Sequence, residues 1–182
     1  MHDIYISGTG VWTPPHKVSN KELVESFNEY VRLYNIENEQ RILDGAVAAL
    51  EPSSEDFIAK ASGILSRYVI DKDSLLNPTI MKPMIEPRDN DALSVSAEIS
   101  VIAAQEALKN AGLQASDIDA VIVSTANLQR AYPAIAIEVQ NELGIEGYAY
   151  DMMVGCSSTT FGISNAYSDI AAGKASKILV IN

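Results

Sequence analysis

The stretch DMMVGCSSTTFG, residues 151–162, contains Cys156, the only cysteine among the 182 residues of the chain. The preceding segment YAYDM reads as a short strand, and the small residues after Cys156 begin a predicted helix. Backbone N–H groups at a helix start, together with the helix dipole, favour a thiolate and can receive an oxyanion. The pattern therefore predicts a cysteine nucleophile, and the alternative is a buried filler, the usual place of a lone cysteine.

A general base for this cysteine is missing from the sequence. The only histidines are His2, at the terminus, and His16, in a proline-rich stretch, and both are predicted to be solvated. SGTG at 7–10 fails as a dinucleotide-binding fingerprint because the third glycine would fall at Thr13. DKDSLL fails as a calcium loop because its sixth position is Leu76. The sequence predicts neither a metal site nor a bound cofactor.

Charge and hydropathy exclude other classes of function. The chain has 13 Lys and Arg against 24 Asp and Glu, which gives a net charge of −11. An acidic surface repels the phosphate backbone, so no nucleic-acid partner is expected. No apolar run approaches the roughly 18 residues that a membrane span needs. The single cysteine and the lack of a signal-peptide pattern predict a cytoplasmic protein.

The first half of the chain is irregular in pattern. Ile4 and Ile6 alternate with polar neighbours, which predicts a strand over 3–11, followed by a loop over 13–20. The capping-box spacing of Ser19 and Glu22 predicts a helix from Asn20. Further along, the pattern predicts a short helix at 55–61, a strand at 67–71 and a long loop with three prolines at 75–91.

From Leu93 onward, helices and strands alternate with short connections. The predicted helices are 93–110, 133–143 and 157–172, and the predicted strands are 120–125, 148–152 and 177–182. The continuous apolar run AVIVST is typical of a parallel sheet that is covered on both faces. The sequence therefore predicts an α/β layered fold with a mainly parallel mixed sheet flanked by helices.

Four segments carry a resemblance to a known family: ISGTGVWTPPHKVSN, ASGILSRYVI, NLQRAYPAIAIEVQNELGI and DMMVGCSSTTFG. They resemble the opening glycine turn, the T-G-I-x-x-R segment, the aromatic-proline segment and the nucleophile segment of β-ketoacyl-acyl-carrier-protein synthase III, of the thiolase-like superfamily. The resemblance implies a thiolase-like fold in which residues 1–182 form the N-terminal half. It also places Cys156 on the acylated cysteine of the family.

The resemblance implies the reaction as well. Cys156 would attack an acyl-CoA and hold the acyl group, and malonyl-acyl carrier protein would lose carbon dioxide so that its carbanion attacks the acyl-enzyme. The histidine and asparagine that assist this step are expected in the C-terminal half, which is absent from this chain, so the chain alone is expected to be incomplete. The expected partners are a second copy in a homodimer and the C-terminal half of the same enzyme, and no cofactor is implied.

Three further residues acquire candidate roles by alignment with the family. Phe57 stands where a tryptophan stacks on the CoA adenine, and Ala61 replaces a pyrophosphate-binding arginine, so the contacts to CoA are expected to differ. Arg67 is either a ligand contact or a structural residue. Tyr132 aligns with an aromatic residue that reaches across the dimer into the partner's acyl pocket, and its alternative role is core packing.

Residues 28–53 exceed the usual length of the family and form a predicted helical insertion. This insertion is either a surface decoration or part of a wider acyl pocket. The apolar face of Phe27, Tyr30, Val31 and Tyr34 favours the pocket, and a medium-chain acyl-CoA is the expected primer. Two rival functions stay open at this point: a thiolase or hydroxymethylglutaryl-CoA-synthase-like condensing enzyme, and a non-catalytic subunit of a split enzyme. Cys156 argues against the second rival.

Overall fold

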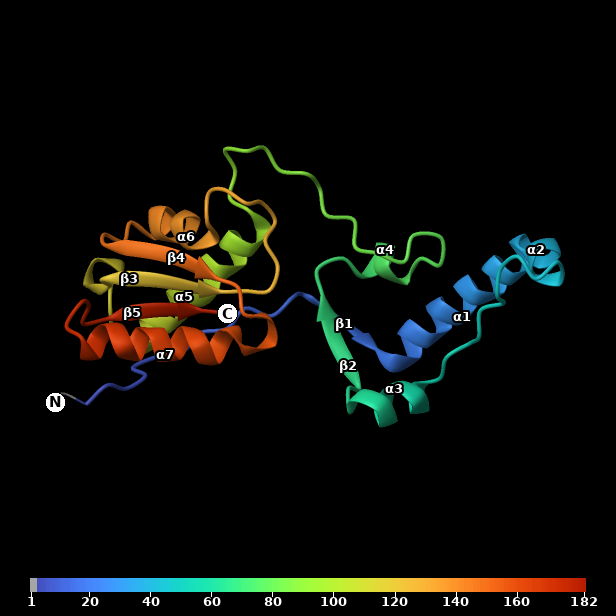
Figure 1. The fold of residues 1–182 in the computed structure, drawn as a ribbon, viewed down its shortest axis with the longest axis horizontal. Helices are drawn as coiled ribbons and strands as arrows, with labels where there is room; N and C mark the ends of the chain where they lie inside the picture. Colours follow the sequence, from blue (N-terminus) through green and yellow to red (C-terminus); the bar gives the residue numbers. More distant parts are fainter. Residues whose placement is uncertain (1–2) are drawn as a thin grey trace. The chain divides into compact units, whose positions relative to one another are not determined.

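The computed structural model describes residues 3–182, which form two compact units (Figure 1). One unit is Thr13–Pro87, and the other combines the segment up to Trp12 with Arg88–Asn182. The helices and strands of the first unit are β1 (His16–Ser19), α1 (Asn20–Glu37), α2 (Glu39–Leu43), α3 (Glu55–Ser62), β2 (Ser66–Val69) and α4 (Lys72–Leu76). Those of the second are α5 (Val95–Ala111), η1 (Ala115–Asp117), β3 (Ala120–Ser124), α6 (Ile135–Leu143), β4 (Tyr148–Met152), η2 (Gly155–Ser157), α7 (Ser158–Ala171) and β5 (Ile178–Ile181).

The second unit is built on a three-stranded parallel sheet in the order β4-β3-β5. Every residue of β3 is buried, because helices cover both faces of this central strand. On one face, Val121 and Val123 join a core with residues of α5 and α6. On the other face, α7 packs across β3 and β5 (Figure 1). The predicted α/β layering and parallel sheet are therefore confirmed.

Residue 147 must be a glycine because the starts of β3 and β4 lie very close together there. Gly147 has a φ of 115°, and a Cβ atom there would lie 2.0 Å from the carbonyl oxygen of Asp119. Asp119 directly precedes β3 and Gly147 directly precedes β4, so this contact fixes where the two parallel strands begin.

Gly147→Ala is expected to destabilise the protein by at least about 2 kcal/mol, because it adds backbone strain to a clash with main-chain atoms. Gly173→Ala is the matched control, since Gly173 has a φ of 74° but a Cβ atom there would meet nothing within 4 Å. The control is expected to cost about 1 kcal/mol. Chemical denaturation of both variants measures the difference, and equal losses would contradict the role of the Asp119 contact.

The first unit pairs β1 with β2 antiparallel and packs α1 beside them. Helix α1 begins with the predicted capping box: Glu22 N–H donates to Ser19 Oγ at 3.2 Å, and Ser19 N–H donates to Glu22 Oε2 at 2.9 Å. Two asparagines on α1 hold the chain that returns from α2. Asn28 exchanges hydrogen bonds with the backbone of Ser53, and Asn35 does the same with Leu50. The segment predicted as an insertion thus contains the end of α1, the short helix α2 and a return segment of irregular backbone that the two asparagines hold.

The strand predicted over residues 3–11 is wrong. This segment is extended but joins no sheet, and it runs along α5. A Cβ on Gly10 would lie 2.1 Å from the Ala103 carbonyl oxygen, and Asn110 Nδ2 donates to the carbonyl of Thr9 at 2.8 Å. The glycines of SGTG therefore serve a close approach to a helix, which the alternation of Ile4 and Ile6 does not reveal.

The elements around it also differ from the prediction in detail. The loop expected over 13–20 contains β1, and α4 lies in a segment where no helix was predicted. The helix expected from Pro133 begins at Ile135. The other predicted helices and strands are confirmed within a few residues.

Candidate active site

Cys156 lies in the turn that connects β4 to α7. It is the middle residue of the single 3₁₀ turn η2, and α7 begins two residues later at Ser158. The turn is closed by Gly155, with a φ of 58°, and by a hydrogen bond of 2.9 Å from Val154 N–H to Ser158 Oγ. The cysteine is exposed in this chain, so the interpretation as a buried filler does not hold.

The start of α7 is set against the sheet by a small residue. A Cβ on Gly162 would lie 2.3 Å from Ser124 Oγ and 3.1 Å from Val180 Cγ1, so the absence of a side chain favours the close approach of the helix to β3 and β5. Ser157, at the N-cap, forms no side-chain hydrogen bond to the helix. The amides of the first turn of α7 are therefore not satisfied by a side-chain cap and suit a thiolate or an oxyanion.

A second loop leaves the same edge of the sheet. Because β3 and β4 are parallel neighbours with Ser124 opposite Met152, the loop 125–134 and the turn that holds Cys156 both begin at the carboxyl end of the strands. Ligands of parallel α/β sheets bind at this end. Tyr132 belongs to the loop and is 88% exposed, which rules out core packing as its role within this chain.

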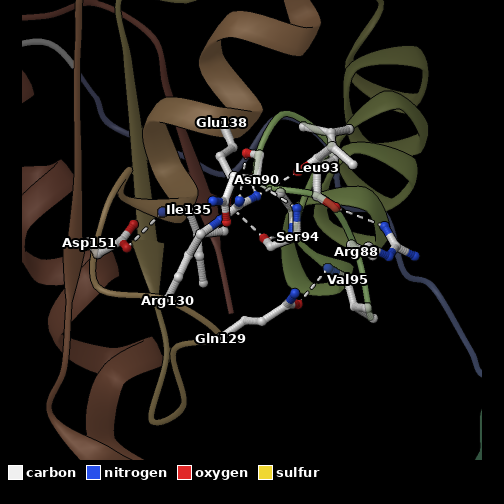
Figure 2. A network of polar contacts seen from close by, with 12 residues as sticks. Arg88, Asn90, Leu93, Ser94, Val95, Gln129, Arg130, Ile135, Glu138 and Asp151 are labelled. Carbon is white, nitrogen blue, oxygen red and sulfur yellow. Dashed lines mark hydrogen bonds and ion pairs between the residues drawn. The ribbon is translucent and has the colours of Figure 1, made fainter. Parts of the chain in front are cut away.

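A buried ion pair anchors that loop (Figure 2). Arg130 pairs with Glu138 of α6, whose side chain is only 5% exposed. The other oxygen of Glu138 accepts a 2.7 Å hydrogen bond from Ser94 Oγ, and Ser94 N–H donates to the carboxylate at 2.9 Å. Ser94 also caps α5 by accepting from Ala97 N–H. One carboxylate thus joins the loop after β3 to the start of two helices.

Asp151 of β4 anchors the other end of the loop (Figure 2). Its two carboxylate oxygens accept the N–H groups of Ile135 and Ala136, each at 2.8 Å. Helix α6 has no side-chain cap of its own, because its N-cap residue is Ala134. A carboxylate from the neighbouring strand therefore serves as the cap and opposes the positive end of the helix dipole.

Asp151→Ala is expected to lower stability by about 1–2 kcal/mol, because two helix amides lose a charged acceptor. Asp151→Asn keeps one oxygen acceptor and is expected to fall between the wild type and the alanine variant. Thermal denaturation of the three proteins tests this order. A melting temperature of the alanine variant equal to that of the wild type would contradict it.

Sequence reasoning missed the four residues of these anchors, Ser94, Arg130, Glu138 and Asp151. Two signals were available, one for each carboxylate. Glu138 follows Ile135 by three positions and directly precedes Val139, so it falls on the apolar face of its helix. The start of α6 also lacks a Ser, Thr, Asp or Asn at its cap, which indicates an acceptor from elsewhere.

The remaining predicted site residues lie in the unit Thr13–Pro87. Phe57 is on α3 and is 67% exposed, as a residue that stacks on a ligand must be. Arg67 is on β2, where its Nη2 donates to Asn20 Oδ1 at 2.7 Å, and its Nη1 is buried without a partner among the described residues. The structure therefore brings Cys156 and the Tyr132 loop to one sheet edge, and it leaves the roles of Phe57 and Arg67 as predictions.

Residues 3–182 offer neither a metal-binding cluster nor a membrane span. Among them, no three His, Cys, Asp or Glu side chains are grouped as a metal ion would need. None of the helices formed by these residues is both long enough and apolar enough to cross a membrane.

Comparison with known proteins finds relatives that are named as acyl-carrier-protein synthases. No protein-family model matches it. The chain is 54% identical over 159 residues to the β-ketodecanoyl-[acyl-carrier-protein] synthase of Pseudomonas aeruginosa, across 87% of this chain and 45% of that protein. It is 32% identical over 130 residues to the β-ketoacyl-[acyl-carrier-protein] synthase III of Brucella anthropi, across 71% of this chain and 34% of that protein. The chain thus spans less than half the length of these curated relatives.

Solved structures agree on the fold. The 3-oxoacyl-[acyl-carrier-protein] synthase III of Aquifex aeolicus matches 96% of this chain and 42% of its own, with a TM-score of 0.66 and 24% identity. The priming β-ketosynthase of the R1128 polyketide pathway matches 94% of this chain with a TM-score of 0.65. The chain is therefore of the thiolase fold. Within that class it is like the N-terminal half of a β-ketoacyl-acyl-carrier-protein synthase III, as its four motifs implied.

Proposed function

We propose that this chain is the nucleophile-bearing half of an acyltransferase that condenses an acyl-CoA primer with malonyl-acyl carrier protein, in fatty acid or related lipid biosynthesis. The observation that carries the proposal is the exposed Cys156 between the end of β4 and the start of α7. The names of the relatives, which are synthases acting on acyl carrier protein substrates, support it.

The first half-reaction uses residues of this chain. The thiolate of Cys156 attacks the thioester carbonyl, the developing oxyanion lies against amides at the start of α7, and the CoA thiolate leaves. The acyl group is then held as a thioester on Cys156. No redox step occurs, so the reaction as proposed needs no cofactor besides the CoA and acyl carrier protein substrates.

The second half-reaction needs groups from outside this chain. Malonyl-acyl carrier protein loses carbon dioxide, and its carbanion attacks the acyl-enzyme, which releases Cys156 and yields β-ketoacyl-acyl carrier protein. We infer that the histidine and asparagine for this step come from a C-terminal half, and that the enzyme is a homodimer. The exposed Tyr132 supports the dimer, because a bare aromatic ring on a loop suits a partner surface. A cytoplasmic setting stays a prediction from the sequence.

The primer is inferred to be a medium-chain acyl-CoA. The Pseudomonas aeruginosa relative is named for a β-ketodecanoyl product, and condensation with a decarboxylated malonyl group adds two carbons. An octanoyl primer would give that product. Each additional buried methylene is worth about 0.8 kcal/mol, so a pocket that buries an octanoyl chain would bind it far more tightly than a short primer.

In the full-length enzyme, octanoyl-CoA is expected to exceed acetyl-CoA in kcat/KM by at least about a hundredfold, because six more methylenes can be buried. Steady-state assays with acetyl-, butyryl- and octanoyl-CoA, with malonyl-acyl carrier protein as the second substrate, measure this. Mass spectrometry of the carrier protein identifies the β-ketoacyl product. A preference for acetyl-CoA of tenfold or more would contradict the primer, and the absence of any β-ketoacyl product would contradict the proposed function itself.

A further inference from the structure

The loop that carries Tyr132 is held on its N-terminal side by Arg130. Besides pairing with Glu138, the guanidinium of Arg130 donates to the carbonyl oxygens of Asn90, at 2.9 Å, and Ala92, at 2.6 Å (Figure 2). The neighbouring Gln129 accepts a 2.8 Å hydrogen bond from Val95 N–H, at the start of α5. Both side chains thus bind the loop to the segment that leads into α5.

On its C-terminal side, the loop is held by Asp151. Tyr132 lies two residues after Arg130 and three before Ile135, so a short span connects the two anchors. The Arg130 side chain before the tyrosine is 19% exposed and Ile135 after it is buried, whereas the tyrosine itself is 88% exposed. The arrangement restricts the backbone of a residue whose own side chain is largely exposed.

Holding the loop in place does not in itself require a buried ion pair such as that of Arg130 with Glu138. The side chains of Arg130 and Glu138 are 19% and 5% exposed, and burying an ion pair has a desolvation cost that well-packed apolar residues avoid. A planar guanidinium fixes the directions of its hydrogen bonds, because its N–H donors form a rigid fork. Here the fork joins two carbonyls and a carboxylate, which fixes the loop in position and orientation.

We propose that Arg130 and Glu138 are positioning residues that set the placement of Tyr132, and thereby the chain length of the acyl group that the enzyme accepts. The inference rests on the proposed function and on the role at an acyl pocket that the alignment of Tyr132 with the family implies. Neither Arg130 nor Glu138 touches the reacting atoms. They act through the loop, so their loss is expected to alter the discrimination between primers more than the reactivity of Cys156.

The test replaces the pair by neutral groups of similar size, Arg130→Met with Glu138→Gln, in the full-length enzyme. Removing both charges leaves no unpaired buried charge, so the variant is expected to fold. The matched control is Lys21→Met with Glu25→Gln, which removes an exposed pair on α1 whose side chains are 69% and 65% exposed. A Tyr132→Ala variant shows what loss of the ring itself does to selectivity.

Two readouts are taken. The first is the ratio of kcat/KM for octanoyl-CoA to that for butyryl-CoA, which is expected to fall by roughly ten- to a hundredfold in the paired variant and to change in the same direction in Tyr132→Ala. The second is hydrogen exchange of the amides in 125–134, which is expected to become faster in the paired variant alone. Arg130→Lys keeps a positive charge beside Glu138 but lacks the planar guanidinium. Its kcat/KM ratio is therefore expected to lie between that of the paired variant and that of the wild type.

The outcomes separate this inference from the proposed function. An active paired variant with an unchanged ratio overturns the positioning role, whether or not hydrogen exchange changes. If the paired variant does not fold, Arg130→Lys decides in its place, and a ratio equal to that of the wild type overturns the proposal. If the wild type forms no β-ketoacyl product from any of these primers, the proposed function fails and the role in primer selection fails with it.

Discussion

Cys156→Ser is expected to abolish acyl transfer, with a fall in kcat/KM of about a thousandfold or more in the full-length enzyme. A hydroxyl is a far weaker nucleophile than a thiolate unless a base activates it, and no residue in the turn 153–157 offers a base. Incubation of the wild type with octanoyl-CoA is expected to add one acyl mass to the protein. Intact-mass spectrometry of the variant is expected to detect no such addition.

Ser157→Ala is the matched control for this experiment. Ser157 is the next residue along the chain, and its side chain makes no capping hydrogen bond to α7. Its replacement is expected to leave the acyl adduct and its stoichiometry unchanged. An adduct that persists in Cys156→Ser would place the nucleophile elsewhere and would remove the basis of the proposed mechanism.

Glu138→Ala is expected to produce the largest loss of stability among the substitutions considered, about 3–5 kcal/mol. The substitution leaves the guanidinium of Arg130, whose side chain is 19% exposed, without its carboxylate partner. It also removes the acceptor of the Ser94 hydroxyl and N–H, both of which are buried. Chemical denaturation of the full-length protein measures the change in the free energy of unfolding.

Two variants show whether burial of the ion pair causes the loss of stability in Glu138→Ala. Glu25→Ala breaks the exposed Lys21–Glu25 pair and is expected to cost no more than about 0.5 kcal/mol, because solvent screens that pair. Combining Arg130→Met with Glu138→Gln is expected to recover most of the loss, because the paired variant leaves no unpaired charge. A cost for Glu138→Ala as small as that for Glu25→Ala would mean that the Arg130 anchor contributes nothing to stability.

The sequence predicted the layered unit well because its signals are local. The run AVIVST became the fully buried β3, and YAYDM became β4 with the predicted bounds. The glycine after each of the helices α5 and α6 has a left-handed conformation and ends the helix where the sequence placed the end. These features depend on residues within one element, so the pattern of one segment was enough to predict them.

The placement of Cys156 was also predictable from its neighbours, since a strand, a small turn and a helix start follow one another along the chain. The tertiary structure decided the rest of the site. Glu138 is 44 residues from Ser94, and nothing near either residue in the sequence indicates the other. Likewise, residues 3–11 have the alternation of a strand, yet they lie along α5, because Gly10 permits an approach to Ala103 that is far away in the sequence. Local patterns determine the helices, the strands and the place of the nucleophile. The pairing of a buried charge depends on which groups the tertiary packing brings together away from water.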